Sequence, residues 1–204
     1  MWGFLAKKIP ALIGWGLLVA IITSAISWFL PWQYSAESQV LLLSSDRFGA
    51  DPYTEIKAAE RVGENLVQLM KTTDFYKKVF ESTGATFDKA AWAAMSERDR
   101  RKHWRKDVQP AMLYGTSLLR VVVYGKNQAE ALALSSSVTR ALAARAGEYI
   151  GSDISVKIVS DSLVSRWPAR PNFALNAILG FLAGVVLSGL WLIAKHRRHH
   201  LVFN

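Results

Sequence analysis

The sequence contains no cysteine, and two long segments of it contain no charged residue. Without cysteine the chain forms no disulfide and binds no metal through thiolates, which excludes a small secreted domain stabilised by disulfides. The uncharged segments cover residues 9–36 and 171–194, and each exceeds the roughly 20 apolar residues that cross a bilayer as a helix. We therefore predict a membrane protein with two transmembrane helices, rather than a soluble enzyme or a disordered chain.

Acidic residues are absent from both ends of the chain. All 16 of them lie between Glu37 and Asp161, whereas the two tails carry only basic residues: Lys7, Lys8, Lys195, Arg197 and Arg198. Positive residues beside a span mark its cytoplasmic side, so we expect both termini inside the cell and the middle segment outside the inner (cytoplasmic) membrane. The positive charges of the two tails make up over half of the net charge of +9, and topology and contact with membrane lipids explain them. The net charge therefore does not predict binding to nucleic acid.

The predicted layout has five parts. A cytoplasmic tail (residues 1–8) precedes the first transmembrane helix (9–32), and an extracytoplasmic domain (33–170) follows. The second transmembrane helix (171–194) leads to a basic cytoplasmic tail (195–204). A signal peptide is the alternative for the N-terminus, but its apolar core is normally about 7–15 residues long, shorter than the apolar segment found here.

The outer segment is predicted to be an α+β domain without internal repeats. Strands are expected at residues 34–43, 118–124 and 154–158, where aliphatic residues gather or alternate with polar ones. Helices are expected at residues 51–70 and 73–81, in two pieces over 87–108 with a start near Ser96, and from Asn127 to a stop at Gly151. The order is β-α-α-α-β-α-β. We expect the first and last strands to pair, because each is joined to a membrane helix, with helices covering one sheet face.

Small residues recur every four positions in both apolar segments: Gly16, Ala20 and Ser24 in the first, and Gly180, Gly184 and Ser188 in the second. Such faces allow two helices to approach closely, within one subunit or between subunits. The alternative is that glycine is simply frequent in membrane helices. Before the second segment, Pro168 and Pro171 fix the backbone and remove amide donors, which predicts a stiff, non-helical elbow.

These residues resemble those of a known family. The run Trp167-Pro168-Ala169-Arg170-Pro171, the segment Gly180–Gly184 and the opening Tyr34-x-Ala36 before an aliphatic strand are similar to the polysaccharide co-polymerases, the Wzz-type chain-length determinants of bacterial envelope glycans. The resemblance implies a non-enzymatic inner-membrane protein that forms a homo-oligomeric ring beside a membrane polysaccharide polymerase or export component. Many members have a longer outer segment, so the resemblance implies a compact member, and the short C-terminal tail implies one without the kinase domain that some members carry.

Two functions follow for testing. The first, implied by the resemblance, is regulation of the chain length, polymerisation or export of an envelope glycan. The alternative is a membrane scaffold or adaptor of an envelope secretion or pilus machine, which needs the same topology.

The sequence predicts no enzyme activity, no cofactor and no bound metal. It has no Gly-rich phosphate loop, and its C-terminal histidines lie among cations, which favours a lipid-headgroup anchor over a metal site. Glu60 and Glu64 share a helix face, which is one arrangement for the paired carboxylates of a glycosidase, but basic residues on the same helix favour a solvated surface. Residues 135–137 are serines inside a predicted helix, and helix packing explains them better than a nucleophile does.

Basic residues gather in one predicted helix around a tryptophan: Arg98, Arg100, Arg101, Lys102, Trp104, Arg105 and Lys106. Guanidinium groups and an indole face could hold an acidic or neutral glycan. Acidic residues on the same helix favour a solvated surface instead, and salt bridges to a neighbouring subunit are a third interpretation. The sequence leaves the three open.

Overall fold

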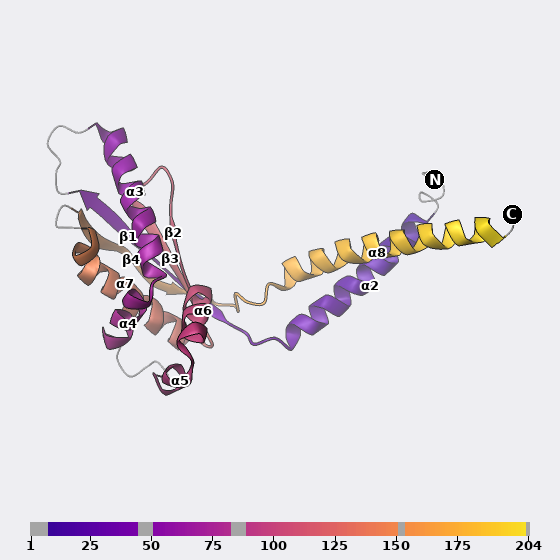
Figure 1. The fold of residues 1–204 in the computed structure, drawn as a ribbon, viewed down its shortest axis with the longest axis horizontal. Helices are drawn as coiled ribbons and strands as arrows, with labels where there is room; N and C mark the ends of the chain where they lie inside the picture. Colours follow the sequence, from indigo (N-terminus) through magenta and orange to yellow (C-terminus); the bar gives the residue numbers. More distant parts are fainter. Residues whose placement is uncertain (1–7, 45–50, 83–88, 151–153, 203–204) are drawn as a thin grey trace. The chain divides into compact units, whose positions relative to one another are not determined.

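The computed structural model describes residues 8–44, 51–82, 89–150 and 154–202 (Figure 1). Within these ranges the protein is α+β, with seven helices and one four-stranded antiparallel sheet. Residues 33–169 form one compact unit, which contains the whole sheet, and the two long apolar helices belong to a second unit.

The sheet has the strand order β2–β3–β1–β4. Its strands are β1 (Tyr34–Ser44), β2 (Val108–Met112), β3 (Leu118–Gly125) and β4 (Ile154–Val164). The first and last strands of the chain are therefore neighbours, as the sequence predicts, with Ala36 opposite Val164 and Leu42 opposite Val156. This pairing holds the two ends of the domain's chain together.

Helices cover one face of this sheet. The helices that contribute to the core are α3 (Pro52–Met70), α4 (Thr73–Ser82), α6 (Glu97–Asp107) and α7 (Gln128–Ile150), and the short helix α5 (Lys89–Ala94) precedes α6. Every second strand residue enters the core; Val40, Leu42, Leu119, Val121 and Val123 are each at most 2% exposed. The two-residue period of a strand places the residues between them on the opposite, half-exposed face.

Strand β2 differs from the sequence prediction, which extends a helix to about Val108 and gives three strands. Val108, Pro110 and Met112 are buried, and the residues between them are exposed. Pro110 lies opposite Val121 in an edge strand, where a missing amide can face solvent. Burial of alternate side chains, rather than β propensity, therefore makes this segment a strand.

Two helix starts match their predicted capping patterns. The Ser96 Oγ accepts a hydrogen bond from the Asp99 amide at 3.2 Å at the start of α6. The Asn127 Oδ1 accepts from the Glu130 amide at 2.8 Å before α7, and the Glu130 carboxylate accepts from the Lys126 amide at 2.9 Å. These side chains satisfy amides that the first turn of a helix leaves without partners. The predicted stop of α7 at Gly151 lies outside the described residues.

The two apolar helices are α2 (Ile9–Trp28) and α8 (Phe173–Val202). Both are long and apolar enough to cross a membrane, over Ile9–Trp28 and Phe173–Ala194. Helix α2 ends before the predicted boundary at Trp32, because Pro31 cannot donate to a helix and disfavours helical backbone before it. Helix α8 continues past the predicted boundary at Ala194, because the following residues up to 202 include neither glycine nor proline.

Candidate functional site

Small residues of α2 and α8 pack against each other within one chain. Gly16, Gly180, Gly184 and Ser188 are buried, and Ala20 and Ser24 are half-buried. A Cβ atom on Gly184 would lie 2.8 Å from the carbonyl oxygen of Trp15 and 2.9 Å from the Cα of Gly16. The helix backbones are thus too close at this point for any larger residue. The structure shows the contact within a subunit, one of the two arrangements that the sequence leaves open.

Polar side chains join the same two helices. The Asn176 Nδ2 donates to the Ser27 Oγ at 2.7 Å. The Thr23 hydroxyl lies 3.2 Å from the carbonyl oxygen of Asn176, and 3.0 Å from that of Ala20 in its own helix. Hydrogen bonds between helices in a membrane contribute about 0.6 kcal/mol on average. Thr23, Ser27 and Asn176 are not among the predicted packing residues. Their signal in the sequence is a polar residue inside an apolar segment.

The proline elbow lies between β4 and α8. Pro168 and Pro171 are both half-buried, and residues 165–172 contain no helix. This backbone agrees with the predicted effect of the two prolines.

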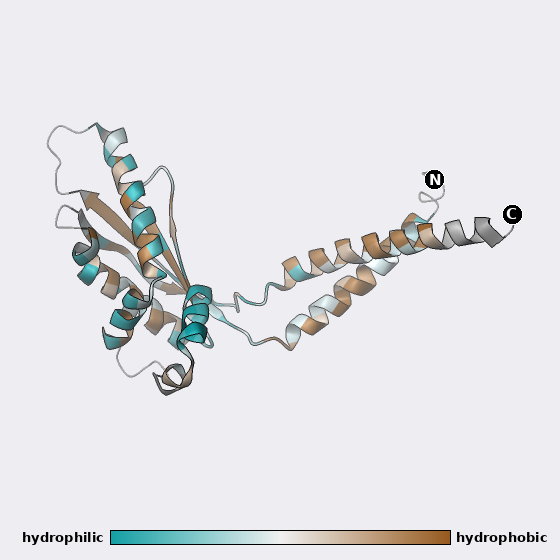
Figure 2. Ribbon diagram, in the orientation of Figure 1, coloured by the Kyte–Doolittle hydropathy of each residue, from teal (hydrophilic) through white to brown (hydrophobic). Residues whose placement is uncertain are grey.

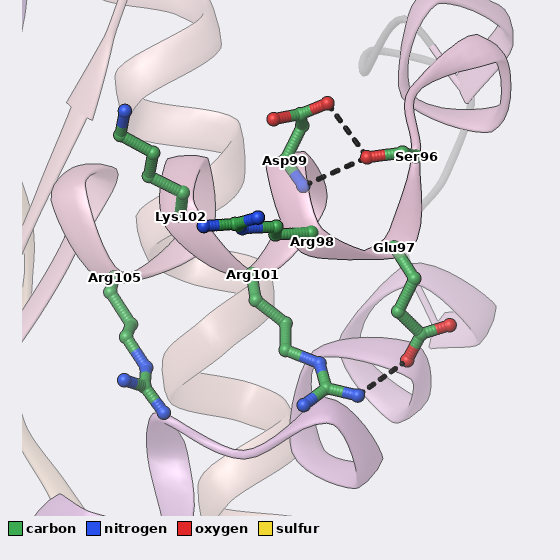
Figure 3. A pocket seen from close by; sticks show the side chains of 7 residues that line it. All are labelled: Ser96, Glu97, Arg98, Asp99, Arg101, Lys102 and Arg105. Carbon is green, nitrogen blue, oxygen red and sulfur yellow. Dashed lines mark hydrogen bonds and ion pairs between the residues drawn. The ribbon is translucent and has the colours of Figure 1, made fainter.

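Helix α6 carries the basic residues that the sequence singles out, and it is hydrophilic along its length in Figure 2. Arg98, Arg101, Lys102, Arg105 and Lys106 are exposed, and Arg100 is half-buried. In Figure 3 the side chains of Arg101 and Arg105 project to the same side of the helix, and Arg101 bonds to Glu97 at 3.1 Å. Within the described part of the chain, no ion pair involves Arg98, Lys102 or Arg105. The helix therefore presents a cationic surface.

Trp104 does not belong to this surface. Its side chain is 1% exposed, and its Nε1 donates to the carbonyl oxygen of Met70 at 2.7 Å. Its ring centroid lies 6.5 Å from that of Phe75 and 6.0 Å from that of Tyr76. Of the three interpretations that the sequence leaves open, the one in which the Trp104 indole face holds a glycan is therefore wrong. Trp104 is the only apolar residue of α6, so it is the side chain that attaches the helix to the core.

Glu60 and Glu64 fix the turn between β2 and β3 to α3. Glu60 is 6% exposed; its carboxylate accepts from the Lys57 ammonium at 2.8 Å and from the Gly115 amide at 2.6 Å. These two donors, Lys57 first, hold the pKa of Glu60 below its usual value. Glu64 accepts from the Tyr114 hydroxyl at 3.1 Å. The interpretation of a solvated face is thus wrong for Glu60, and both carboxylates have a structural role.

The predicted packing role of the serines in α7 agrees with the structure at Ser135. This residue is fully buried, and its hydroxyl accepts from that of Ser162 on β4 at 2.9 Å. The hydroxyls of Ser38 on β1 and Thr139 on α7 are 2.6 Å apart. A buried hydroxyl network therefore joins α7 to the sheet.

An ion cluster that no sequence pattern indicates joins α4 to α7. The Lys78 Nζ lies 2.8 Å from the Glu148 carboxylate, 2.7 Å from the Tyr149 hydroxyl and 3.2 Å from the Asp74 carboxylate. Tyr149 also donates to Asp74. Glu148 and then Tyr149 raise the pKa of Lys78, while Lys78 lowers that of Glu148, and Tyr149 and then Lys78 lower that of Asp74. Positions so distant in sequence give no local pattern that would reveal the cluster.

No protein-family model matches the chain, and no curated protein matches it significantly. Among the described residues, no group of three or more His, Cys, Asp or Glu is arranged to hold a metal ion. The geometry defines an α+β domain with a cationic helix, in a chain with two helices of membrane-spanning length.

Proposed function

We propose that the protein is a non-enzymatic polysaccharide co-polymerase, anchored in the inner membrane by α2 and α8 and assembled as a homo-oligomer. It would regulate the chain length, polymerisation or export of an envelope glycan beside a membrane polymerase or export component. The glycan as the polymer acted on is proposed from the resemblance of the opening and closing segments to this family. The membrane-anchored architecture is proposed from the pairing of β1 with β4.

The pairing of β1 with β4 is the observation that supports this proposal most. Residues 29–33 connect α2 to β1, and residues 165–172 connect β4 to α8. Beyond the ladder, the Ser165 amide donates to the Ser35 carbonyl at 2.7 Å, and the Ala169 amide donates to the Gln33 carbonyl at 2.8 Å. Both connections therefore leave the domain from hydrogen-bonded neighbours, as a domain held by two adjacent membrane helices requires.

The apolar helices support membrane anchoring. Their spans have mean hydropathies of 2.2 and 2.3, and their outward side chains, such as Ile21, Ile178 and Val186, are exposed in the chain alone. Trp28, Trp32 and Phe173 cluster at one end of the pair, with ring centroids 5.4–6.5 Å apart. Aromatic residues concentrate where a bilayer meets water, and the basic tails lie beyond the other end of each span in the sequence.

The cationic surface of α6 supports assembly with a second copy or with a glycan. Arg98, Lys102 and Arg105, which take part in no ion pair among the described residues, can form salt bridges across an interface, and such charges steer association with anionic groups. The alternative for this helix is a solvated surface without a partner. Purification of the protein in detergent followed by imaging tests assembly directly. Ring-shaped particles support a homo-oligomer, and monomers contradict it.

Deletion of the gene in the cells that produce the protein tests the glycan function. We expect the length distribution of an envelope glycan, separated on a gel, to change on deletion and to return when the wild-type chain is supplied. Unchanged glycan lengths together with a defect in secretion or pilus assembly would reject the proposal in favour of the scaffold alternative.

A further inference from the structure

All four strands pass through one row of residues at one end of the domain. Val108 on β2 lies opposite Val123 on β3, and Ala36 on β1 lies opposite both Val123 and Val164 on β4. Strand β1 begins two residues before this row and β4 ends in it. This end of the domain, from which the connections to α2 and α8 leave, is its base.

Three segments that are distant in sequence each place an exposed cation at the base. Arg105 lies at the end of α6, just before β2 begins at Val108. Lys126 follows Gly125, the last residue of β3, and Arg166 lies just after β4. The side chains of Arg105, Lys126 and Arg166 are exposed, and no ion pair among the described residues involves them. These three side chains are the base surface.

Cations outnumber acids in the segments that form the base. Residues 104–108, 125–130 and 165–170 contain two acids, Asp107 and Glu130. The Glu130 carboxylate already accepts a hydrogen bond from the Lys126 amide at 2.9 Å. The same segments contain five cations: Arg105, Lys106, Lys126, Arg166 and Arg170. The base is therefore a positively charged end.

The opposite end of the sheet is not cationic. There the Glu60 carboxylate accepts from the Gly115 amide in the turn between β2 and β3, and Glu64 accepts from the Tyr114 hydroxyl. Lys57 lies beside them, but it is paired with Glu60 at 2.8 Å. The free positive charge therefore lies at the end where the chain enters and leaves the domain.

In the proposed topology, the base surface is within reach of the bilayer. The connection between α2 and β1, residues 29–33, spans at most about 18 Å when fully extended, and it includes Trp32 of the interfacial aromatic cluster. Trp167, next to Arg166, is 78% exposed, and tryptophan concentrates where a bilayer meets water. Lys and Arg are attracted to an anionic bilayer surface over about one Debye length, about 8 Å at physiological ionic strength.

We propose that the base surface binds the anionic lipid headgroups of the outer leaflet. The phosphate oxygens of a lipid such as phosphatidylglycerol accept from Arg105, Lys126 and Arg166, because guanidinium and ammonium groups both bind phosphate. The proposal rests on the membrane topology of the proposed function. It adds a second attachment of the domain to the membrane, besides the two apolar helices.

Hydrogen–deuterium exchange of the full chain in nanodiscs, followed by mass spectrometry, tests this attachment. One set of nanodiscs contains phosphatidylcholine alone, and the other contains equal parts of phosphatidylcholine and phosphatidylglycerol. Each Lys or Arg near an anionic surface favours the docked state about fivefold. We therefore expect amides in residues 104–108, 125–130 and 165–170 to exchange at least about twofold more slowly with phosphatidylglycerol. The turn at 113–117 should exchange equally in both lipids.

High salt tests whether the attraction is electrostatic. At about 1 M salt the Debye length falls to about 3 Å, and the difference between the two lipids should disappear. A difference that persists at this salt concentration would contradict binding through charge.

Two triple variants locate the binding surface. The test variant replaces the three residues of the base surface with glutamine and should lose the difference between the two lipids. The control variant removes the same charge from exposed cations outside the base segments and should keep the difference: Arg61→Gln, Arg140→Gln and Lys157→Gln. Near-UV circular dichroism verifies the fold of both variants.

Three results overturn the proposal. The first is equal exchange of the wild-type chain in the two lipids, and the second is an equal loss in both triple variants, which shows diffuse attraction. The third is slower exchange of the base segments when tetragalacturonate is added to phosphatidylcholine nanodiscs, without an effect of phosphatidylglycerol. That result assigns the base surface to an acidic glycan.

The outcomes for the base surface and for the proposed function are separable. If gene deletion changes glycan lengths but phosphatidylglycerol does not slow exchange at the base, the base surface is rejected and the proposed function stands. If phosphatidylglycerol slows exchange through the base surface but deletion leaves glycan lengths unchanged, the base surface stands and the glycan function is rejected.

Discussion

Trp104 attaches α6 to the rest of the domain through one hydrogen bond and several ring contacts. Large aromatic side chains in a core contribute several kcal/mol, because truncation loses both buried area and packing. We expect Trp104→Ala to lower the free energy of unfolding by about 3–5 kcal/mol. Denaturant titration of the full chain in detergent, followed by near-UV circular dichroism, measures the loss.

Trp167→Ala is the control for Trp104→Ala, because Trp167 is 78% exposed. An exposed substitution of this kind changes stability by no more than about 0.5 kcal/mol. A similar loss in the two variants would contradict the core position of Trp104.

The Lys78 ion cluster makes the domain sensitive to acid. The folded-state pKa values of Asp74 and Glu148 lie below their ordinary values of 3.8 and 4.5. A carboxylate with a lowered pKa stabilises the fold fully above its unfolded-state pKa, and this contribution is lost as the pH falls through the folded-state value. We expect thermal stability of the full chain to fall as the pH drops below about 4.5. The Lys78→Met variant should be less stable than the wild-type chain at pH 7. Its thermal stability should also fall less than that of the wild-type chain on acidification.

Lys126→Met is the control for the acid experiment. Lys126 is exposed, and only its backbone amide takes part in a hydrogen bond that the structure shows. Thermal midpoints between pH 3 and 7 should follow the wild-type slope in this variant, and a wild-type slope in Lys78→Met would refute the role of the cluster.

At the scale of elements, contact between α2 and α8 is open to a direct test because the chain has no native cysteine. A Cβ atom at position 180 would lie 3.1 Å from the Thr23 Cβ, close to the roughly 3.5–4.5 Å of a disulfide. We expect the double variant Thr23→Cys/Gly180→Cys to form an intramolecular disulfide on mild oxidation, seen as faster migration on a non-reducing gel.

Gly14→Cys/Gly180→Cys is the matched control for this cross-link. Among the described residues, no atom of another element lies within 4 Å of a Cβ built on Gly14, so this pair should not form the intramolecular product. Adding Gly184→Leu to the Thr23/Gly180 pair should reduce cross-linking, since the leucine forces the two backbones apart. Equal yields in all three variants would reject the packing.

The elements that the sequence predicts well are those with local signals. The spacing of apolar residues in α3 and the capping residues Ser96 and Asn127 each act within a few positions, so their effects are visible in the sequence. Strand β2 is different: Pro110 argues against a strand, and only burial against distant residues makes it one. The same limit applies to the candidate site, because the sequence groups Trp104 with its basic neighbours, while burial separates it from them.

At the scale of the whole molecule, the proposed topology predicts which residues are accessible from outside the cell. With both termini inside, Lys126→Cys should react with a membrane-impermeant maleimide in intact cells, and Lys8→Cys should react only after the membrane is permeabilised. Both side chains are exposed in the described structure, so accessibility differs only through the membrane. Labelling of both positions from the same side would overturn the topology and, with it, the proposed function.

The contacts of Thr23, Ser27 and Asn176 have a mechanical consequence for the apolar helices. In hydrocarbon there is no water to replace a lost partner, so sliding α8 by one turn along α2 would take the Asn176 amide away from its acceptor, the Ser27 hydroxyl. The glycine contact at Gly184 resists rotation as well, because a turn of α8 would bring its larger neighbour Ala183 or Val185 into the close contact. In the proposed membrane topology, the two helices are therefore expected to share a single depth in the lipid and to move as one rod.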